Sequence, residues 1–241
     1  DRNQDAGVGR DPRCLIQNWQ DPAFAEAWDA RHLAGNPARA EHLALLLAIL
    51  EQVKGGGWIL DLGCGSGLVA QIMLDKFANA RVFGLDSSAA MLRIAKDRLG
   101  PYGERVRLAE GDLTSLDGVE APEGCSAAIA VQSLHHLDEA QYQAAVRWTF
   151  DHLAAGGWFF IIDRLAIPSE TLYSAFHVLR ERQGQSPNPG DWLGYLEWLE
   201  VNGDRPLPVQ SILRLLEEAG FQSAALDVRG DRGMLIGRRP T

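Results

Sequence analysis

A short apolar segment that runs straight into three closely spaced glycines constrains the fold of this chain more than any other feature. Residues 59–67 read Ile-Leu-Asp-Leu-Gly-Cys-Gly-Ser-Gly, and a helix-like apolar pattern follows from Leu68 to Phe77. Glycines in such a turn allow positive φ and carry no Cβ, so the backbone can approach a nucleotide or an amino-acid-like ligand closely. The order strand, glycine turn, helix therefore predicts a ligand-binding α/β domain.

Short apolar segments recur along the chain with helix-like patterns between them. The first five lie at Trp58–Leu62, Val82–Leu85, Val106–Ala109, Ala127–Val131 and Trp158–Ile162. Near-continuous apolar strands that alternate with helices predict a parallel sheet covered on both faces, with right-handed crossovers. The helix predicted over Glu139–Leu153 is expected to end at a glycine C-cap in Ala155–Gly157.

The alternation stops after Asp163. Two helices, Ser169–Gln183 and Asp191–Val201, follow each other with no strand between them, and Gly-Asp-Arg-Gly at 230–233 predicts a hairpin between the last two strands. The chain is therefore expected to have four parts. These are an N-terminal helical cap (1–56), a ligand-binding core (57–164), a helical insert that acts as a lid (165–205), and a C-terminal helix and hairpin that complete the sheet (206–241).

Composition narrows the class of protein. The 241 residues carry a formal net charge of −9, which argues against tight binding to nucleic acid, because a phosphate backbone needs basic patches. Three scattered cysteines indicate neither a disulfide framework nor a cysteine-rich zinc site, so a reducing cytoplasm is expected. The longest apolar run, Leu43–Leu50, is far too short to span a membrane, and the polar N-terminus has no apolar signal segment.

The detail of the glycine loop separates two kinds of cofactor. The dinucleotide fingerprint is Gly-x-Gly-x-x-Gly, but here the third glycine, Gly67, comes one residue early. Asp61 also sits inside the strand, where a carboxylate would repel a pyrophosphate and suit an ammonium group. A nicotinamide-dependent dehydrogenase is therefore disfavoured.

With Asp61 and its glycines, this loop resembles the first motif of the class I S-adenosylmethionine (SAM)-dependent methyltransferases, in particular the small-molecule type 11 and type 12 families. The resemblance is close over about residues 57–164 and extends in pattern to the last thirty residues. It implies an α/β, Rossmann-like fold: a seven-stranded, mostly parallel sheet with an antiparallel last strand, helices on both faces and a helical lid. It also implies SAM as cofactor and S-adenosylhomocysteine as product.

The resemblance carries further motifs. Asp86, 23 residues after Gly63, implies a ribose-binding acid, although an acid favoured at a helix N-terminus is the alternative. Gly111-Asp112 implies an acceptor for the adenine amino group, or else a simple turn. The full implied cofactor set is Asp61, Gly63, Cys64, Gly65, Gly67, Asp86, Ser87, Met91, Gly111, Asp112, Leu113, Gln132 and Trp28. Plain core packing explains Met91 and Trp28 about equally well.

Two adjacent histidines, His135 and His136, follow the fourth strand at the edge where ligands bind. An imidazole with a pKa near ~6.5 can take a proton from an acceptor at neutral pH, so either is a candidate general base, with His135 slightly favoured. The alternative is that one caps the next helix and the other packs. A metal site is not predicted, because neighbouring side chains rarely point the same way and no third ligand stands at metal spacing.

The acceptor side of the site is less defined. Charged residues after the fifth strand and aromatic or histidine side chains of the insert are candidates for substrate contacts: Asp163, Arg164, Tyr173, His177, Trp192 and Tyr195. A salt bridge at the strand end, packing within the insert, or a dimer contact would explain them as well.

The predicted function is transfer of a methyl group to an O or N atom of a small organic molecule, by in-line displacement, with a histidine base where the acceptor must lose a proton. Two alternatives stay open: a SAM-binding enzyme with other chemistry, such as carboxyl transfer or cyclisation, and a macromolecule methyltransferase. The expected partner is a small molecule, with no nucleic acid or membrane, and the chain is expected to be a monomer or a homodimer.

Overall fold

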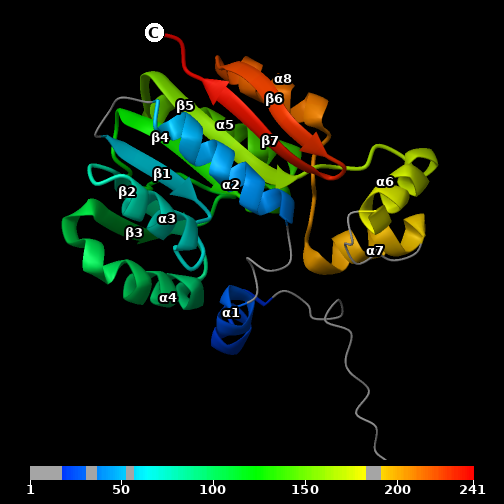
Figure 1. The fold of residues 1–241 in the computed structure, drawn as a ribbon, viewed down its shortest axis with the longest axis horizontal. Coiled ribbons are helices and arrows are strands. Elements are labelled where there is room, and N and C mark those ends of the chain that lie inside the picture. Colours follow the sequence, from blue (N-terminus) through cyan, green and yellow to red (C-terminus); the bar gives the residue numbers. More distant parts are fainter. Residues whose placement is uncertain (1–17, 31–36, 53–56, 183–190) are drawn as a thin grey trace, which may run out of the picture.

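The computed structural model describes residues 18–30, 37–52, 57–182 and 191–241. Its centre is a seven-stranded sheet with the strand order β3-β2-β1-β4-β5-β7-β6 (Figure 1). The strands are β1 (Trp58–Leu62), β2 (Arg81–Asp86), β3 (Val106–Glu110), β4 (Cys125–Val131), β5 (Leu153–Arg164), β6 (Gln222–Arg229) and β7 (Arg232–Arg238). The first five pair in parallel, while β7 is antiparallel to both β5 and β6. The predicted fold is therefore confirmed.

Helices cover both faces of the sheet, and each face has its own buried apolar cluster (Figure 1). One face is covered by α5 (Glu139–His152) and α8 (Val209–Ala219), and the other by α2 (Pro37–Leu50), α3 (Leu68–Lys76) and α4 (Ala89–Leu99). Because side chains alternate along a strand, Leu60 and Leu62 of β1 face the first cluster, while Ile59 packs in the second. Asp61 therefore lies on the side of α2 and α3.

Two short 3₁₀ turns complete the core, η2 (Gly100–Arg105) and η3 (Leu134–His136). The turn η3 comes directly after β4, at the carboxyl edge of the parallel strands. It positions both histidines at the edge where open α/β sheets bind ligands.

The remaining helices of the described chain lie outside these layers (Figure 1). The helix α1 (Pro22–Asp29) begins at Asp21, whose side chain caps the helix, and it packs on α4. The helices α6 (Glu170–Arg182) and α7 (Trp192–Asn202), which we call the arm, pack on each other through a cluster centred on Tyr173 and Tyr195. None of the described helices combines the length and the apolar character that a membrane span requires.

The glycine C-cap predicted after α5 is wrong. The helix ends at His152, and Leu153, in an extended conformation, begins β5 at once. Gly156 and Gly157 lie inside this long strand, and a Cβ on Gly157 would stand 2.9 Å from the Ala154 carbonyl oxygen and 3.2 Å from that of Cys125. Gly157 therefore allows close backbone approach within the sheet, Gly156 adopts a φ of 78° there, and neither glycine ends a helix.

Candidate active site

The glycine loop connects β1 to α3 in a conformation that only glycine adopts easily. Gly63, Gly65 and Gly67 all have positive φ, between 53° and 76°. A Cβ on Gly63 would lie 2.4 Å from the Cβ of Ser133, whereas a Cβ on Gly65 would meet nothing within 4 Å. The first glycine thus lets two loops pack, and the second opens onto empty space.

This contrast predicts different effects of alanine at the two positions. Gly63→Ala is expected to lower the free energy of unfolding by about 2–4 kcal/mol, from strain at positive φ plus overpacking against Ser133. Gly65→Ala is expected to cost only about 1–2 kcal/mol of strain but to weaken cofactor binding at least tenfold, because its methyl group projects into the pocket. Urea unfolding and calorimetry on both variants check this, and equal stability losses would contradict it.

A pocket with roughly 980 Å³ of empty space, part of it open to solvent, lies above the loop. Its polar and small lining residues are Arg39, Asp61, Gly63, Cys64, Gly65, Ser66, Asp86, Ser87, Asp112, Thr114, Gln132, Ser133 and His136. Its apolar lining residues are Trp19, Trp28, Leu68, Val69, Met91, Leu113, Val131 and Leu137. The volume is within the range of small-molecule and cofactor sites. Eleven of the thirteen implied cofactor residues therefore line one cavity, and Gly67 and Gly111 do not.

Asp61 is the least satisfied polar group of the pocket. Its side chain is buried, and its Oδ2 atom has no hydrogen-bond partner among the described residues. Burial, reinforced by the nearby Asp86 and opposed by Arg39, raises the pKa of Asp61 to about 7. A buried carboxylate without a partner is costly, so the site is complementary to a positively charged donor.

Asp86 ends β2 and points back towards the loop. Its Oδ2 accepts a 2.8 Å hydrogen bond from the backbone N–H of Gly65, and its Oδ1 accepts one of 2.8 Å from Ser88. Asp112 lines the same cavity and also accepts a hydrogen bond from the backbone N–H of Thr114. It can therefore stabilise a turn and still present an oxygen to a ligand. The two acids stand at the ends of neighbouring strands, as ligand groups of such sheets do.

The helix α1 and the turn before it cover the pocket with aromatic side chains. Trp19 and Trp28 both line the cavity and pack edge to face, with ring centroids 5.3 Å apart. Asp29, at the end of α1, is bound bidentately by Arg98, at 3.1 and 2.7 Å, and also contacts the Ser66 hydroxyl of the glycine loop. A half-buried bidentate pair thus holds the cover on the loop.

Removing the contact between Arg98 and Asp29 is expected to weaken the closure of α1 over the pocket. Arg98→Ala should speed cofactor dissociation about tenfold, since a hydrogen bond to a charged group contributes roughly 1.5–3 kcal/mol and Arg98 makes several. Arg93→Ala, which removes the exposed ion pair of Arg93 with Glu26 on the same two helices, is the matched control and should change little. Stopped-flow dissociation checks this, and equal rates in both variants would contradict it.

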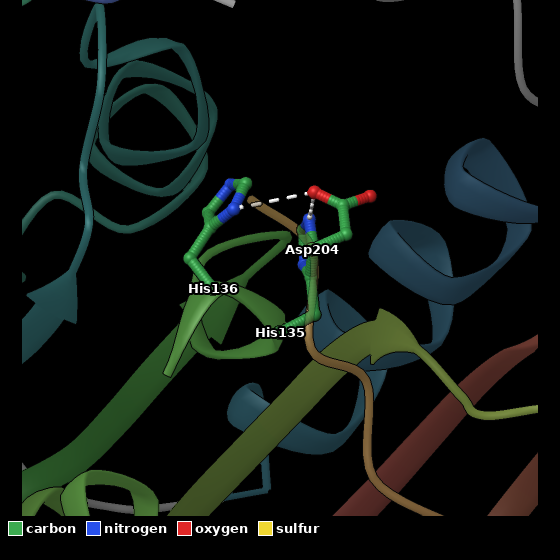
Figure 2. Close-up of side chains that lie close together, drawn as sticks. All are labelled: His135, His136 and Asp204. Carbon is green, nitrogen blue, oxygen red and sulfur yellow. Dashed lines mark ion pairs between the residues drawn. The ribbon is translucent and has the colours of Figure 1, made fainter. Parts of the chain in front are cut away.

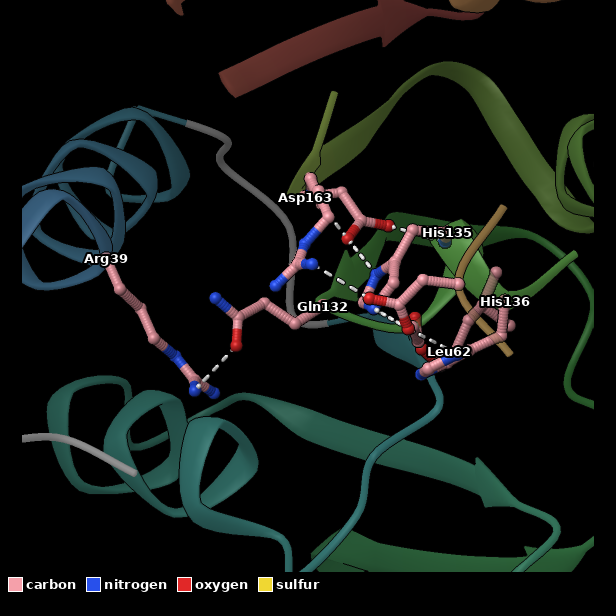
Figure 3. Close-up of polar contacts among 9 residues, drawn as sticks. Arg39, Leu62, Gln132, His135, His136 and Asp163 are labelled. Atoms are coloured by element: carbon pink, nitrogen blue, oxygen red, sulfur yellow. Dashed lines mark hydrogen bonds and ion pairs between the residues drawn. The ribbon is translucent and has the colours of Figure 1, made fainter. Parts of the chain in front are cut away.

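Sequence patterns missed Arg39, which extends from α2 into the pocket. It is the single arginine of a mostly apolar helix, is buried, and donates to the Gln132 side chain at 3.2 Å (Figure 3). Gln132 itself has φ of 57°, a rare value for a residue other than glycine, while its backbone N–H bonds Ile162. Backbone strain of this kind clusters at functional sites. The lone arginine of α2 was the available signal.

The two histidines differ sharply in setting (Figure 3). His135 is buried and does not line the pocket; its Nδ1 lies 2.5 Å from Asp163 Oδ1, and its backbone N–H bonds the other oxygen of Asp163 at 3.0 Å. Burial lowers the pKa of His135, and the Asp163 carboxylate only partly offsets this. His136 lines the pocket, and the structure therefore favours His136 over His135 as the residue that meets a ligand.

Both imidazoles approach one carboxylate, that of Asp204, which follows α7 (Figure 2). Its Oδ1 lies 3.3 Å from His136 Nδ1 and 3.6 Å from His135 Nε2, while its Oδ2 lies 2.9 Å from Arg164. Burial alone would lower the pKa of His136, but Asp204 and then Asp163 raise it above the ordinary value. No pattern near Gly203-Asp204 signalled this contact, which spans 68 residues of chain.

These three side chains also form a donor set that a metal ion can use, with ligand atoms within 4.8 Å of one another. A metal site was not expected from the sequence, because neighbouring histidine side chains rarely point the same way. In the structure, however, the turn η3 brings the two imidazole rings to 4.2 Å between centroids. Arg164, whose guanidinium also lies 4.2 Å from the centre of the Trp198 ring, already supplies one positive charge to Asp204. The cluster is therefore a network in which Arg164 is the permanent cation and Asp204 the acid that both Arg164 and His136 contact.

The six residues predicted to contact substrate do not line the described pocket. Asp163 and Arg164 belong to the charge network behind it, as the salt-bridge alternative proposed. Tyr173, Tyr195 and Trp192 pack on one another in the arm, and His177 pairs with Glu181 on the same helix at 3.7 Å. The arm approaches the site through the segment that carries Asp204.

The sheet order, the inserted antiparallel strand and a carboxylate-lined pocket over a Gly-x-Gly-x-Gly loop agree with the resemblance to the class I SAM-dependent methyltransferases. Residues 59–157 match the family profile described as "Methyltransferase domain". This segment of the chain is thus a methyltransferase domain, and SAM is the cofactor that the class implies.

Curated relatives and solved structures agree with this class. The chain is 28% identical to trans-aconitate 2-methyltransferase of Delftia acidovorans, over 70% of this chain and 60% of that protein. It is 24% identical to carboxy-S-adenosyl-L-methionine synthase of Campylobacter jejuni, over 84% and 85% of the two chains. A putative O-methyltransferase from Nostoc punctiforme has the same fold, with a TM-score of 0.64, 18% identity, and coverage of 92% of this chain and 60% of that one. The chain spans less than two thirds of the first of these relatives.

Proposed function

We propose that this protein transfers a methyl group from SAM to an O or N atom of a small organic molecule by in-line displacement. The observation that carries the proposal is the single pocket in which the buried Asp61, with an unsatisfied oxygen, lies beside Asp86 and Asp112. The relatives that act on small molecules and the net charge of −9, which is unfavourable for a nucleic-acid acceptor, support the choice of acceptor class.

The residues of the pocket fit the charges and hydrogen-bonding groups of this cofactor. Asp61 would accept from the ammonium group and Arg39, which lies near it on the facing helix, would bind the carboxylate. Asp86 would accept from the ribose hydroxyls, and Asp112 from the adenine amino group. The ammonium and carboxylate groups of the cofactor would thus each meet a buried side chain of opposite charge. The Asp61 oxygen that has no hydrogen-bond partner would gain a donor.

The bound cofactor supplies a methyl group already activated on a sulfonium. The protein needs to position an acceptor in line with that group and to exclude water. Trp19 and Trp28 line the cavity and shield part of it from solvent. His136, the imidazole that lines the pocket, is the proposed proton acceptor, while His135 is proposed to hold Asp163 and the turn η3 in place.

A second candidate function uses the same pocket for carboxyl transfer to the cofactor. The match to carboxy-S-adenosyl-L-methionine synthase over most of both chains favours it. The two functions differ in product, because methyl transfer releases S-adenosylhomocysteine and carboxyl transfer yields a heavier cofactor.

Two measurements test the proposal. Thermal unfolding with SAM, S-adenosylhomocysteine or NAD should show stabilisation by the first two alone, since only a ligand of the folded state raises the midpoint. Mass spectrometry after incubation with SAM and a panel of phenols, alcohols, amines and carboxylic acids should then show S-adenosylhomocysteine. Stabilisation by NAD alone would reject the proposal, and a carboxylated cofactor would establish the second candidate.

A further inference from the structure

We propose that the acceptor of this enzyme carries a proton at neutral pH, as a hydroxyl or an ammonium group does, and that Asp204 is the positioning residue that enables His136 to remove it. This inference rests on the proposed methyl transfer and specifies its substrate class. It assigns a role to a residue that belongs to neither the glycine loop nor the cofactor motifs.

Backbone hydrogen bonds hold the Asp204 carboxylate beside the imidazole of His136. It comes from the segment between α7 and α8, and its side chain is only 1% exposed. Its backbone N–H bonds Leu199, and the N–H of the next residue, Arg205, bonds the carbonyl oxygen of His135. The segment is therefore fixed to the turn η3 by its own backbone, and the Asp204 carboxylate is directed at the histidines.

The contact of Asp204 with His136 Nδ1 fixes the role of the other ring nitrogen. A carboxylate beside Nδ1 favours the tautomer with hydrogen on Nδ1, which leaves Nε2 with a lone pair on the ring that lines the pocket. It also stabilises the imidazolium that forms when Nε2 takes a proton. A carboxylate, an imidazole and a pocket in this order form an arrangement typical of general-base catalysis.

The other charges around His136 act in the same sense or are already paired. Asp163 from β5 and Asp86 from β2 are the further acids that interact with it, and His135 is the adjacent base. Asp163 is bound to His135, and Asp86 is bound to the backbone of the glycine loop. Trp19 of the cover lies 6.4 Å away between ring centroids and carries no charge. Asp204 is therefore the acid whose removal changes His136 most.

The proposed substrate class follows from the presence of a general base, which only some acceptors need. A carboxylate acceptor has no proton at neutral pH and needs no base, whereas a hydroxyl or an ammonium must lose one. In the proposed step the acceptor proton moves to His136 Nε2, the acceptor lone pair forms the bond to the methyl carbon, and the carbon–sulfur bond breaks. The imidazolium later returns the proton to solvent.

The first test needs no acceptor. The six histidines are labelled with ¹⁵N and titrated by NMR in the full chain, and His136→Gln identifies the signal of His136. In Asp204→Asn the midpoint of His136 is expected to fall by about one pH unit or more, because an adjacent opposite charge shifts a pKa by roughly 1–3. Glu200→Gln removes an exposed acid from α7 and is the matched control. An unchanged His136 midpoint in Asp204→Asn overturns the inference.

The second test uses the acceptor panel of phenols, alcohols, amines and carboxylic acids. Transfer is expected to the acceptors that carry a proton, and Asp204→Asn should lower kcat about 10–100-fold with little change in KM. The acidic limb of its pH–rate profile should move to lower pH, and Asp204→Glu should restore part of kcat. A purely structural Asp204 would lower stability without moving that limb, and this result overturns the inference.

The failures of the two proposals are distinguishable. If SAM and S-adenosylhomocysteine do not bind, the proposed function fails, whatever His136 does in the NMR titration. If both bind but methyl transfer occurs only to carboxylic acids, or no hydroxyl or amine of the panel is methylated, the proposed acceptor class fails while the cofactor assignment stands.

Discussion

Replacing Asp61 by asparagine is expected to stabilise the free protein and, at the same time, to lower its affinity for SAM by at least about 100-fold. The first effect arises because burial raises the pKa of Asp61 to about 7, so the folded chain bears the cost of a buried charge above that pH. The second arises because the ammonium group of the cofactor loses its ionised partner, a change that typically costs roughly 2–5 kcal/mol.

The sign of the stability effect follows from proton linkage. Between the pKa of an unfolded aspartate, near ~3.9, and about 7, the folded chain holds a proton on Asp61 that the unfolded chain has released. Stability therefore falls as pH rises through this window, and the penalty is complete above it. The asparagine variant removes the penalty, with an expected gain of about 1–3 kcal/mol at pH 8 and little gain at pH 4.

Thermal unfolding of the free chain at several pH values and calorimetry with SAM measure the two effects. A gain of 1–3 kcal/mol corresponds to roughly 3–8 °C in the unfolding midpoint for a domain of this size. Asp97→Asn, on the exposed side of α4, is the control and should leave both quantities unchanged. A variant that is less stable than the parent at pH 8, or that binds SAM normally, would show that Asp61 is ionised and satisfied within the protein itself.

Replacing His136 by glutamine is expected to lower kcat about 100–1,000-fold while cofactor affinity changes less than threefold. General-base catalysis contributes typically 10²–10⁴ in rate, and glutamine keeps a polar side chain of similar length without a titrating nitrogen. The affinity is expected to be preserved because, in the proposed arrangement, the carboxylates of the loop and of the strand ends hold the cofactor. A steady-state assay of S-adenosylhomocysteine release with the best acceptor gives kcat, and calorimetry gives the affinity.

Variants of two other histidines serve as comparisons for His136→Gln. His152, at the end of α5, bonds the Trp148 carbonyl oxygen and lies outside the pocket, so His152→Gln should have near-normal kcat. His135→Gln is expected to lower the free energy of unfolding while kcat changes little, because His135 is buried against Asp163 and does not line the cavity. If His135→Gln retained stability but lost all activity, the assignment of the base to His136 would be refuted.

Local patterns in the sequence were sufficient to predict most of the residues that line the glycine-loop side of the pocket. Asp61, the glycines and Asp86 lie within one strand–loop–helix–strand unit, and the spacing of that unit is fixed by its secondary structure. Parallel strands bring their carboxyl ends to one edge, so the placement of Asp112 beside them follows from the order of the elements. The glycine C-cap failed because Gly156 and Gly157 serve sheet packing, which local patterns do not reveal.

The acceptor half depended on contacts between distant segments. Aromatic spacing in the insert suggested a substrate lid, but Tyr173 and Tyr195 are used to pack the arm on itself. Arg39 reaches the pocket only because α2 crosses the face of the sheet on which Asp61 lies. The preference for His135 over His136 could not be corrected from sequence, because adjacent residues share every local signal and only burial separates them.

The sequence by itself determined the α/β fold, the glycine loop and the acids that line the pocket, because strand periodicity and short-range turn geometry are set by neighbouring residues. Only the tertiary structure decided which histidine meets the pocket, that Arg39 joins it, and that Asp204 stands behind His136. Those contacts connect residues far apart in the chain, and they form only when the packing of helices on the sheet brings the segments together.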